Sequence, residues 1–246
     1  MEMDDQRIAA LIADLDHRDK PTIRAAVAAL IHLATNSPSV REKLNRRLSA
    51  GGHRNYWPVA FILGNLPRPS HDAQSALLGA LDHRDPDIRW AIALLLVRIA
   101  KEQPELIDSL IHLSADGSCN QKRMALYAIR DLALSDPASL SALLTALHDA
   151  EPTVRVAAAI CLKQRHDVDD AARDLLLRVY LNDMELKVQH AVAITLATVG
   201  EPQPEFLTAL SRNRESRNEQ TKKAAIFALE LLKKRRSASS GSTSDR

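Results

Sequence analysis

Apolar residues recur along most of the chain at the spacing of one helix face. Ile8, Leu11, Ile12 and Leu15 follow the i, i+3, i+4, i+7 pattern of an amphipathic helix. The stretch 91–99 is instead apolar nearly all round, so a helix there must be buried by neighbouring elements on several sides. Short polar turns separate these two kinds of helix, which alternate. The pattern predicts helical hairpins whose second helices are buried by neighbouring hairpins.

The turns repeat at a nearly constant interval. Residues 20–24, 85–89 and 151–155 read KPTIR, DPDIR and EPTVR. Aligning the last residue of this pentapeptide along the chain gives steps of 65, 34, 32, 34 and 34 residues between Arg24, Arg89, Arg123, Arg155, Gln189 and Lys223. The first step is about twice the others, which places a degenerate copy at 55–59. The chain is therefore predicted to contain six to seven copies of one repeat.

Prolines mark the joints between the predicted elements. Pro86 suits the first turn of a helix, where its missing amide hydrogen would have no partner, and Asp85 is a suitable N-cap. The expected hairpins are 5–35, 38–67, 70–102, 104–134, 137–165, 168–200 and 203–235. Together they form a single solenoid over residues 1–236. The small polar residues 237–246 have nothing to bury and are expected to be disordered.

Composition agrees with an all-α chain. The sequence of 246 residues is 46% hydrophobic, but only 3% of residues are aromatic, and Ala and Leu supply most of the apolar mass. Leu94 and Leu144 lie on apolar helix stretches and, if fully buried, should each cost about 2–5 kcal/mol when truncated. No run of about 18 apolar residues is present, and the acidic N-terminus does not resemble a signal peptide. A soluble cytoplasmic protein is expected.

The [D/E]-P-x-[I/V]-R turn, followed by an Ala-rich helix, resembles the HEAT-repeat superfamily, specifically the PBS-lyase HEAT-like type. The resemblance covers residues 5–235 and implies a right-handed α-solenoid of about seven HEAT-like helical hairpins. It implies several functions, because this superfamily includes non-catalytic scaffolds, phycobilin lyase subunits, a deoxyhypusine hydroxylase and related DNA glycosylases. Fold alone does not choose among these.

The turn arginines allow two interpretations. Arg24, Arg89 and Arg155 could pair with acidic turn residues and form a ladder that fixes the register of the stack; the candidate partners are Asp16, Asp82, Asp85 and Glu151. Alternatively, the second helices line a concave groove, and a basic row faces an acidic partner; this row comprises Arg24, Arg89, Arg123, Arg155 and Lys223. The nearby carboxylates favour the ladder.

The degenerate second repeat contains the best candidate binding residues. Trp57 falls one residue short of the position that Trp90 occupies in the repeat, so both tryptophans could join Arg54, Tyr56 and Arg89 in one patch. Trp, Tyr and Arg are enriched in binding hot spots. The alternative is that both tryptophans fill gaps between Ala-rich helices. Our predicted partner-binding set is Arg54, Tyr56, Trp57, Arg89, Trp90, Arg123 and Arg155.

The sequence gives little support to catalysis. The hydroxylase binds iron through His-Glu dipeptides, and this sequence contains none. Cys161 is expected in the core and Cys119 in an exposed turn, and neither has a recognisable activating base. The few glycines form no phosphate-binding loop. We therefore predict no catalytic residue, metal or cofactor, and the chain is not expected to be an enzyme.

The charge distribution disfavours nucleic acid. Residues 211–246 carry a net charge of +6 and residues 1–210 a net charge of −4. The basic end contains Lys222, Lys223 and residues 233–236, which fits a solvated terminal repeat and a helix C-terminus. The sequence thus predicts a non-catalytic scaffold or adaptor that binds a protein along its concave face. The alternative is an enzyme subunit of the phycobilin lyase or hydroxylase kind, and a DNA glycosylase fits less well.

Overall fold

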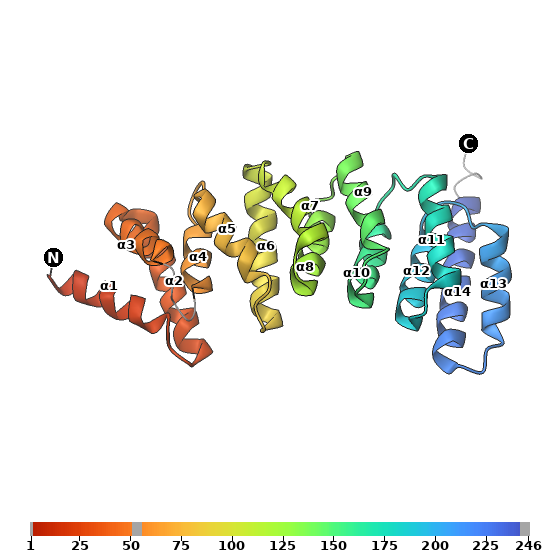
Figure 1. Cartoon of the computed structure of the whole chain (residues 1–246), viewed down its shortest axis with the longest axis horizontal. Coiled ribbons are helices and arrows are strands. Elements are labelled where there is room, and N and C mark those ends of the chain that lie inside the picture. The colour runs from red at the N-terminus through yellow and green to blue at the C-terminus, as the bar shows by residue number, and fades with distance from the viewer. Residues whose placement is uncertain (1, 51–55, 242–246) are drawn as a thin grey trace. The chain divides into compact units, whose positions relative to one another are not determined.

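A computed structural model describes residues 2–50 and 56–241, and in these residues the chain is all-helical (Figure 1). The fourteen helices of this part of the chain are α1 (Glu2–Asp14), α2 (Lys20–Asn36), α3 (Pro38–Ser49), α4 (Trp57–Gly64), α5 (His71–Ala80), α6 (Pro86–Glu102), α7 (Leu106–Asp116), α8 (Cys119–Asp131), α9 (Pro137–Ala146), α10 (Pro152–Leu162), α11 (Asp170–Asn182), α12 (Leu186–Thr198), α13 (Pro204–Arg214) and α14 (Glu219–Gly241). They pair in order into seven hairpins, so each even-numbered helix is a second helix. This confirms the predicted all-α solenoid of HEAT-like repeats.

Local sequence signals explain where the helices begin. Seven of the described helices have proline at the first or second position, where no intrahelical amide partner is lost. Asp85 is the N-cap of α6, as predicted, and its carboxylate accepts a hydrogen bond from the Asp87 amide. Ser118 and Gln121 form a reciprocal capping box at α8. The turn chemistry read from the sequence therefore sets the hairpin boundaries.

The helices divide into two compact units, where the sequence suggested one domain. Unit 1 extends to Leu132 and unit 2 begins at Ala133, whose φ of 52° places this non-glycine residue in the left-handed region. In unit 1 the second helices α2, α4, α6 and α8 contact one another in sequence. In unit 2, α10 contacts α12, and α12 contacts α14. Each unit is thus a stack of second helices with first helices on its outside.

The cores of both units are built largely from the second helices. In unit 1 one apolar cluster joins α4, α5, α6, α7 and α8, and another joins α2, α3 and α4. The condition of full burial is not met for Leu94, because this side chain on α6 is 57% exposed. Leu144 on α9 is half-buried. The neighbours Leu95 and Leu96 fill the core instead, since the buried face of α6 is set by its contacts with α4 and α8.

Two features concern the limits of the helices. α14 continues to Gly241, through the first five residues of the predicted polar tail, and the Ser237 hydroxyl donates to the carbonyls of Lys233 and Lys234. A serine that bonds back to its own helix is compatible with continued helix.

The described part of the chain contains no helix that is both long and apolar enough to cross a membrane.

Candidate functional site

The second helices share one burial pattern, and this pattern fixes the register of the repeat. Two buried residues, one more exposed residue and two further buried residues follow one another in α4, α6, α8, α10 and α12. The five segments are 59–63, 92–96, 125–129, 158–162 and 192–196. Each segment lies 33 or 34 residues after the one before. The residue in the middle of each segment faces out of the core, because its neighbours on both sides face in.

Large apolar side chains occupy this outward position in six consecutive repeats. We call them the apolar row: Phe61, Leu94, Tyr127, Ile160, Ile194 and Phe227. Unit 1 contributes the first three and unit 2 the last three. Leu94, Ile160 and Phe227 are 57%, 37% and 48% exposed, and the others are half-buried. The first repeat has only alanines here, Ala28 and Ala29.

An isolated exposed leucine needs no explanation, but exposed apolar groups that recur with the repeat mark an interaction surface more strongly. Phe61 and Tyr127 also pack against the core clusters of unit 1, whereas Leu94 belongs to neither cluster. The sequence analysis did not predict this row, because apolar residues at helical spacing are normally interpreted as core residues. Its period of 33 residues is nevertheless visible in the sequence.

Aromatic stacking shapes the row in unit 1. The rings of Trp90 and Tyr127 are stacked, with centroids 5.4 Å apart and planes at 20°. The guanidinium of Arg130 lies 5.1 Å from the centre of the Tyr127 ring and also donates a 2.7 Å hydrogen bond to Asp131. Trp90 remains 41% exposed. The stack therefore presents a flat aromatic surface beside Leu94.

The two tryptophans have different surroundings. Trp57 is half-buried, packs against both apolar clusters of unit 1, and meets the His83 ring edge to face at 6.0 Å. Trp90 stacks on Tyr127 instead. The burial pattern places them at equivalent positions, 33 residues apart on α4 and α6, so the prediction that Trp57 falls one residue short is wrong. Trp57 serves packing to a larger degree than Trp90 does.

Two other predicted residues flank Trp57. Tyr56 is exposed at the N-cap of α4, and a Cβ added at Gly79 would lie 3.2 Å from its hydroxyl oxygen. The tyrosine hydroxyl thus lies close to α5. Arg54 lies outside the described residues.

Arg89 and Arg155 hold their own turns together. Arg89 donates hydrogen bonds to the carbonyls of His83 and Arg84, 2.7 and 3.1 Å away. Arg155 makes the same contacts with the carbonyls five and six residues before it, at 3.1 and 2.9 Å. Gln189 donates to the carbonyl six residues before it, at 2.6 Å. A donor at this position therefore stabilises the turn in three repeats.

Arg155 also links two repeats of unit 2. Its guanidinium donates to both carboxylate oxygens of Asp183, at 2.8 and 2.9 Å. Burial alone would raise the pKa of Asp183, but hydrogen bonds from Arg155 and the Glu185 amide hold this pKa below its ordinary value. The hydrogen bond to Asp183 raises the pKa of Arg155. Arg155 therefore acts as the ladder interpretation expects, although Asp183 was not among the carboxylates we named.

Arg123 does not belong to the turn ladder. The burial register makes Lys122 the equivalent of Arg89, and Arg123 the equivalent of Trp57 and Trp90. The pentapeptide alignment was one residue off because α8 starts after a Ser118 cap, not after the proline-containing turn. The Nε atom of Arg123 is buried and has no acceptor among the described residues. This arginine has hydrogen-bonding capacity that the fold does not use.

Net charge differs between the second helices and the rest of the chain. The second helices contain sixteen Lys and Arg and five Asp and Glu, a net charge of +11. The whole chain has a net charge of +2, so the remaining residues carry −9. In unit 1, α4, α6 and α8 together contribute +3, whereas α5 and α7 contain three acidic residues and no Lys or Arg. The helices α4, α6 and α8 that carry the row in unit 1 are therefore net basic, and the first helix α3 also has a net charge of +3.

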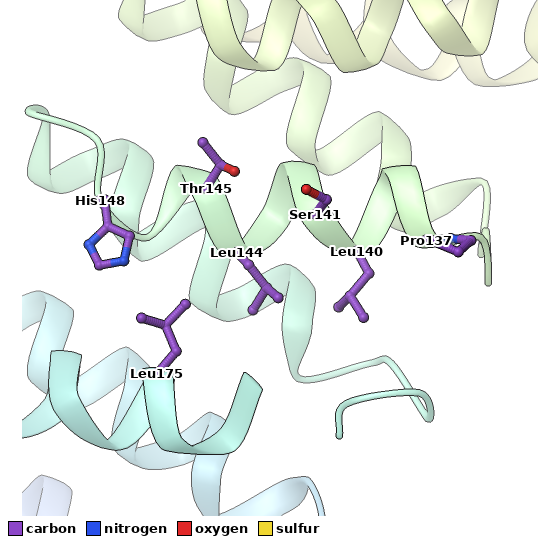
Figure 2. A pocket seen from close by; sticks show the side chains of 7 residues that line it. All are labelled: Pro137, Leu140, Ser141, Leu144, Thr145, His148 and Leu175. Atoms are coloured by element: carbon purple, nitrogen blue, oxygen red, sulfur yellow. The ribbon is translucent and has the colours of Figure 1, made fainter. Parts of the chain in front are cut away.

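A second surface feature lies between first helices of unit 2. A cleft of about 340 Å³ separates α9 from α11, and Figure 2 shows Leu140 and Leu144 of α9 pointing toward Leu175 of α11. His148 stands at one end of this cleft, while Ser141 and Thr145 point to the other side of α9. The cleft arises because α9 and α11 lie farther apart than α10 and α12, which pack directly. Its wide opening and apolar lining contain no convergent polar groups.

The histidine and cysteine side chains considered in the sequence analysis make local hydrogen bonds or pack in the core. The Nδ1 atom of His83 accepts the Asp85 amide at 3.0 Å, and His17 accepts the Asp19 amide at 3.1 Å. Cys161 is buried, as predicted, and Cys119 is half-buried. Within the described ranges, no group of three or more His, Cys, Asp or Glu side chains is placed to hold a metal ion.

Solved structures with similar folds include human deoxyhypusine hydroxylase in complex with glycerol (16% identity, 93% of this chain and 96% of that chain, TM-score 0.37). Two designed armadillo repeat proteins are 20% and 19% identical, and the second is in complex with the peptide (KR)4. Both matches cover 92% of this chain and 99% of the designed one, with a TM-score of 0.43. At these values the similarities do not bear on function.

Comparison with curated protein sequences finds no significant relative. The profile of HEAT repeats matches residues 107–197 and 140–230, which together cover half of the chain. This profile describes HEAT repeats in general, and the PBS-lyase subtype stays a prediction. The matched segments coincide with hairpins that stack on their second helices and share one turn chemistry. The chain belongs to the HEAT-repeat family.

Proposed function

We propose that this protein is a non-catalytic binding module that holds a protein partner against its second helices. The apolar row carries this proposal. Six large apolar residues recur at 33- or 34-residue steps on the outward side of second helices, three in each unit. Burial of an exposed leucine or phenylalanine by a partner would contribute about 1.5–3 kcal/mol each. A row of such contacts suits an elongated partner surface.

The predicted partner-binding residues take different parts in this proposal. Trp90 contributes directly, through its exposed stack with Tyr127. Arg123 lies in line with Trp90 and is half-buried. Arg89 and Arg155 instead support the turns, and Trp57 fills the space between α4 and its neighbours. The binding surface is thus centred on Leu94, which the predicted set did not contain.

Site-specific photo-crosslinking tests the proposal. We would place a photoreactive phenylalanine analogue at Leu94 or, as a matched control, at Leu181, which is 44% exposed but lies on the first helix α11. Crosslinking in cells followed by mass spectrometry should recover the same protein from position 94 and from position 90, and not from position 181. Equal recovery of this protein from position 181, or no crosslinked protein from the apolar row, would contradict the proposal.

A further inference from the structure

Three properties of the second-helix face of unit 1 restrict the chemistry of a partner. The face carries the apolar residues Phe61, Leu94 and Tyr127 at one position per repeat. Its helices α4, α6 and α8 have a net charge of +3. Arg98 and Lys101 are exposed on α6. A partner that fits all three has apolar side chains at regular intervals and carboxylates between them.

The spacing of the row selects a backbone conformation for the partner. Packed helices lie about 8–10 Å apart, so neighbouring residues of the row are separated by about this distance. A polyproline II segment has three residues per turn and advances about 9 Å per turn, which brings every third side chain to the same side. A β-strand alternates its side chains, so residues three apart point in opposite directions. A polyproline II segment therefore matches the row one residue per repeat.

The aromatic stack favours the same type of ligand. Proline-rich polyproline II segments dock on aromatic surfaces, and the exposed Trp90 ring on Tyr127 provides such a surface beside Leu94. Because a polyproline II segment is already extended before binding, little conformational entropy is lost on docking. A nucleic acid strand is less suitable, because Arg89 and Arg130 already form hydrogen bonds and the row would leave apolar side chains against phosphates.

We infer that unit 1 binds an acidic polyproline II segment with a large apolar residue at every third position. This inference rests on the proposed function and names its ligand class. The apolar side chains contact Leu94 and its neighbours in the row. The carboxylates lie toward the exposed basic residues of α6, Arg98 and Lys101, on the same side of the helix as Leu94.

Fluorescence anisotropy with synthetic peptides and the full chain tests the inference. The probe is a labelled peptide of Leu-Pro-Glu repeated three times, and it is compared with Leu-Pro-Lys repeats and with a shuffled peptide whose leucines are two apart. The acidic period-three peptide should bind at least about tenfold more tightly than either, and added salt should weaken it. Comparable affinity for the lysine or shuffled peptide would overturn the inference, as would tighter binding of a labelled oligothymidine.

Point variants test which face of the protein binds the peptide. Leu94→Ser and Lys101→Gln should each weaken binding by about tenfold, as expected for one buried leucine or one charge-assisted hydrogen bond. Leu181→Ser and Arg46→Gln are matched controls, because both positions are exposed on first helices, and they should leave affinity unchanged. Circular dichroism verifies that each variant folds. Equal losses in the controls would contradict the assignment to this face.

The two experiments separate the two claims. A protein crosslinked from position 94, combined with no preference for the acidic period-three peptide, would retain the binding module and reject this ligand class. Absence of both results would reject both claims.

Discussion

The guanidinium of Arg155 and the carboxylate of Asp183 form two parallel hydrogen bonds, 2.8 and 2.9 Å long, between the start of α10 and the turn before α12. Both side chains are largely buried, with 14% and 7% exposure. Because Arg155 also binds two carbonyls of its own turn, one side chain ties together two consecutive repeats. This ion pair therefore connects two consecutive repeats of unit 2.

Removal of the Asp183 carboxylate should therefore destabilise unit 2. We expect Asp183→Ala to lower the free energy of unfolding by about 2–3 kcal/mol at pH 7, measured by urea denaturation. The pKa of Asp183 is lowered in the folded state, so this contribution is complete above the ordinary value of 3.8 and is lost as the pH falls through the folded pKa. The difference from wild type should accordingly shrink at about pH 3. Glu215→Ala, in an exposed pair with Arg214, serves as the control and should change stability by less than about 0.5 kcal/mol.

A hydroxyl on α12 provides a second link between repeats. The fully buried Thr195 donates to the Ala159 carbonyl of α10 at 2.7 Å. Thr195→Val keeps the shape and removes this hydrogen bond, so it should cost about 1 kcal/mol in urea unfolding. The hydroxyl of Thr198 donates only to the Ile194 carbonyl of its own helix among the bonds described here, and Thr198→Val should be nearly neutral. Equal effects of the two substitutions would contradict the link.

Two leucines that are close in sequence should respond differently to truncation. Leu96 is fully buried in unit 1, and Leu96→Ala should cost about 2–5 kcal/mol. Leu94→Ala should cost less than about 0.5 kcal/mol, because Leu94 is mostly exposed. Thermal and urea unfolding of the two variants would measure this difference. A large loss of stability for Leu94→Ala would show that this residue belongs to the core.

Acidification should weaken the turn before α6. Burial lowers the pKa of His83, against a smaller opposing effect of the Asp85 carboxylate, so the neutral ring is favoured in the folded state. Its contribution to stability is present above the ordinary histidine pKa of 6.5 and is lost as the pH falls through the lowered folded pKa. Protonation also removes the acceptor for the Asp85 amide.

The substitution His83→Asn isolates this effect. The asparagine oxygen can accept the Asp85 amide, as the carboxylate of Asp149 accepts the Glu151 amide at 2.8 Å in a later repeat. We expect the variant to show a smaller fall in thermal midpoint between about pH 7 and pH 5 than wild type does. His190, whose pKa is also lowered by burial, remains in both proteins and accounts for part of the residual fall. An unchanged pH profile would contradict the role of His83.

The hairpins could be predicted from the sequence because proline, caps and apolar spacing act locally. Asp85 and Pro86 define the start of α6 wherever the rest of the chain lies. The register of Arg123 could not be derived in this way, because the turn before α8 replaces proline with Ser118. Only the burial of Ala125 and Leu126 shows that α8 is shifted by one residue relative to the pentapeptide alignment.

The candidate surface was only partly accessible to sequence reasoning. Trp90 was identified by residue type, but Leu94 was assigned to the core, since the side of a helix that faces neighbours depends on how those neighbours pack. Leu94 and Leu96 have identical side chains, and only the contacts of α6 with α4 and α8 distinguish them. The constant spacing of the apolar row in successive repeats was the missing signal.

The difference in net charge between second helices and the rest of the chain also affects kinetics. The second helices together carry a net charge of +11 and the rest of the chain −9, so the field close to the second helices attracts negative charge. Such a field rotates a negatively charged molecule during diffusion, so that its first collision occurs in a productive orientation. Mobile ions shorten the reach of this field to about 8 Å at physiological ionic strength, so the rate of encounter falls more steeply with salt than the lifetime of the complex does.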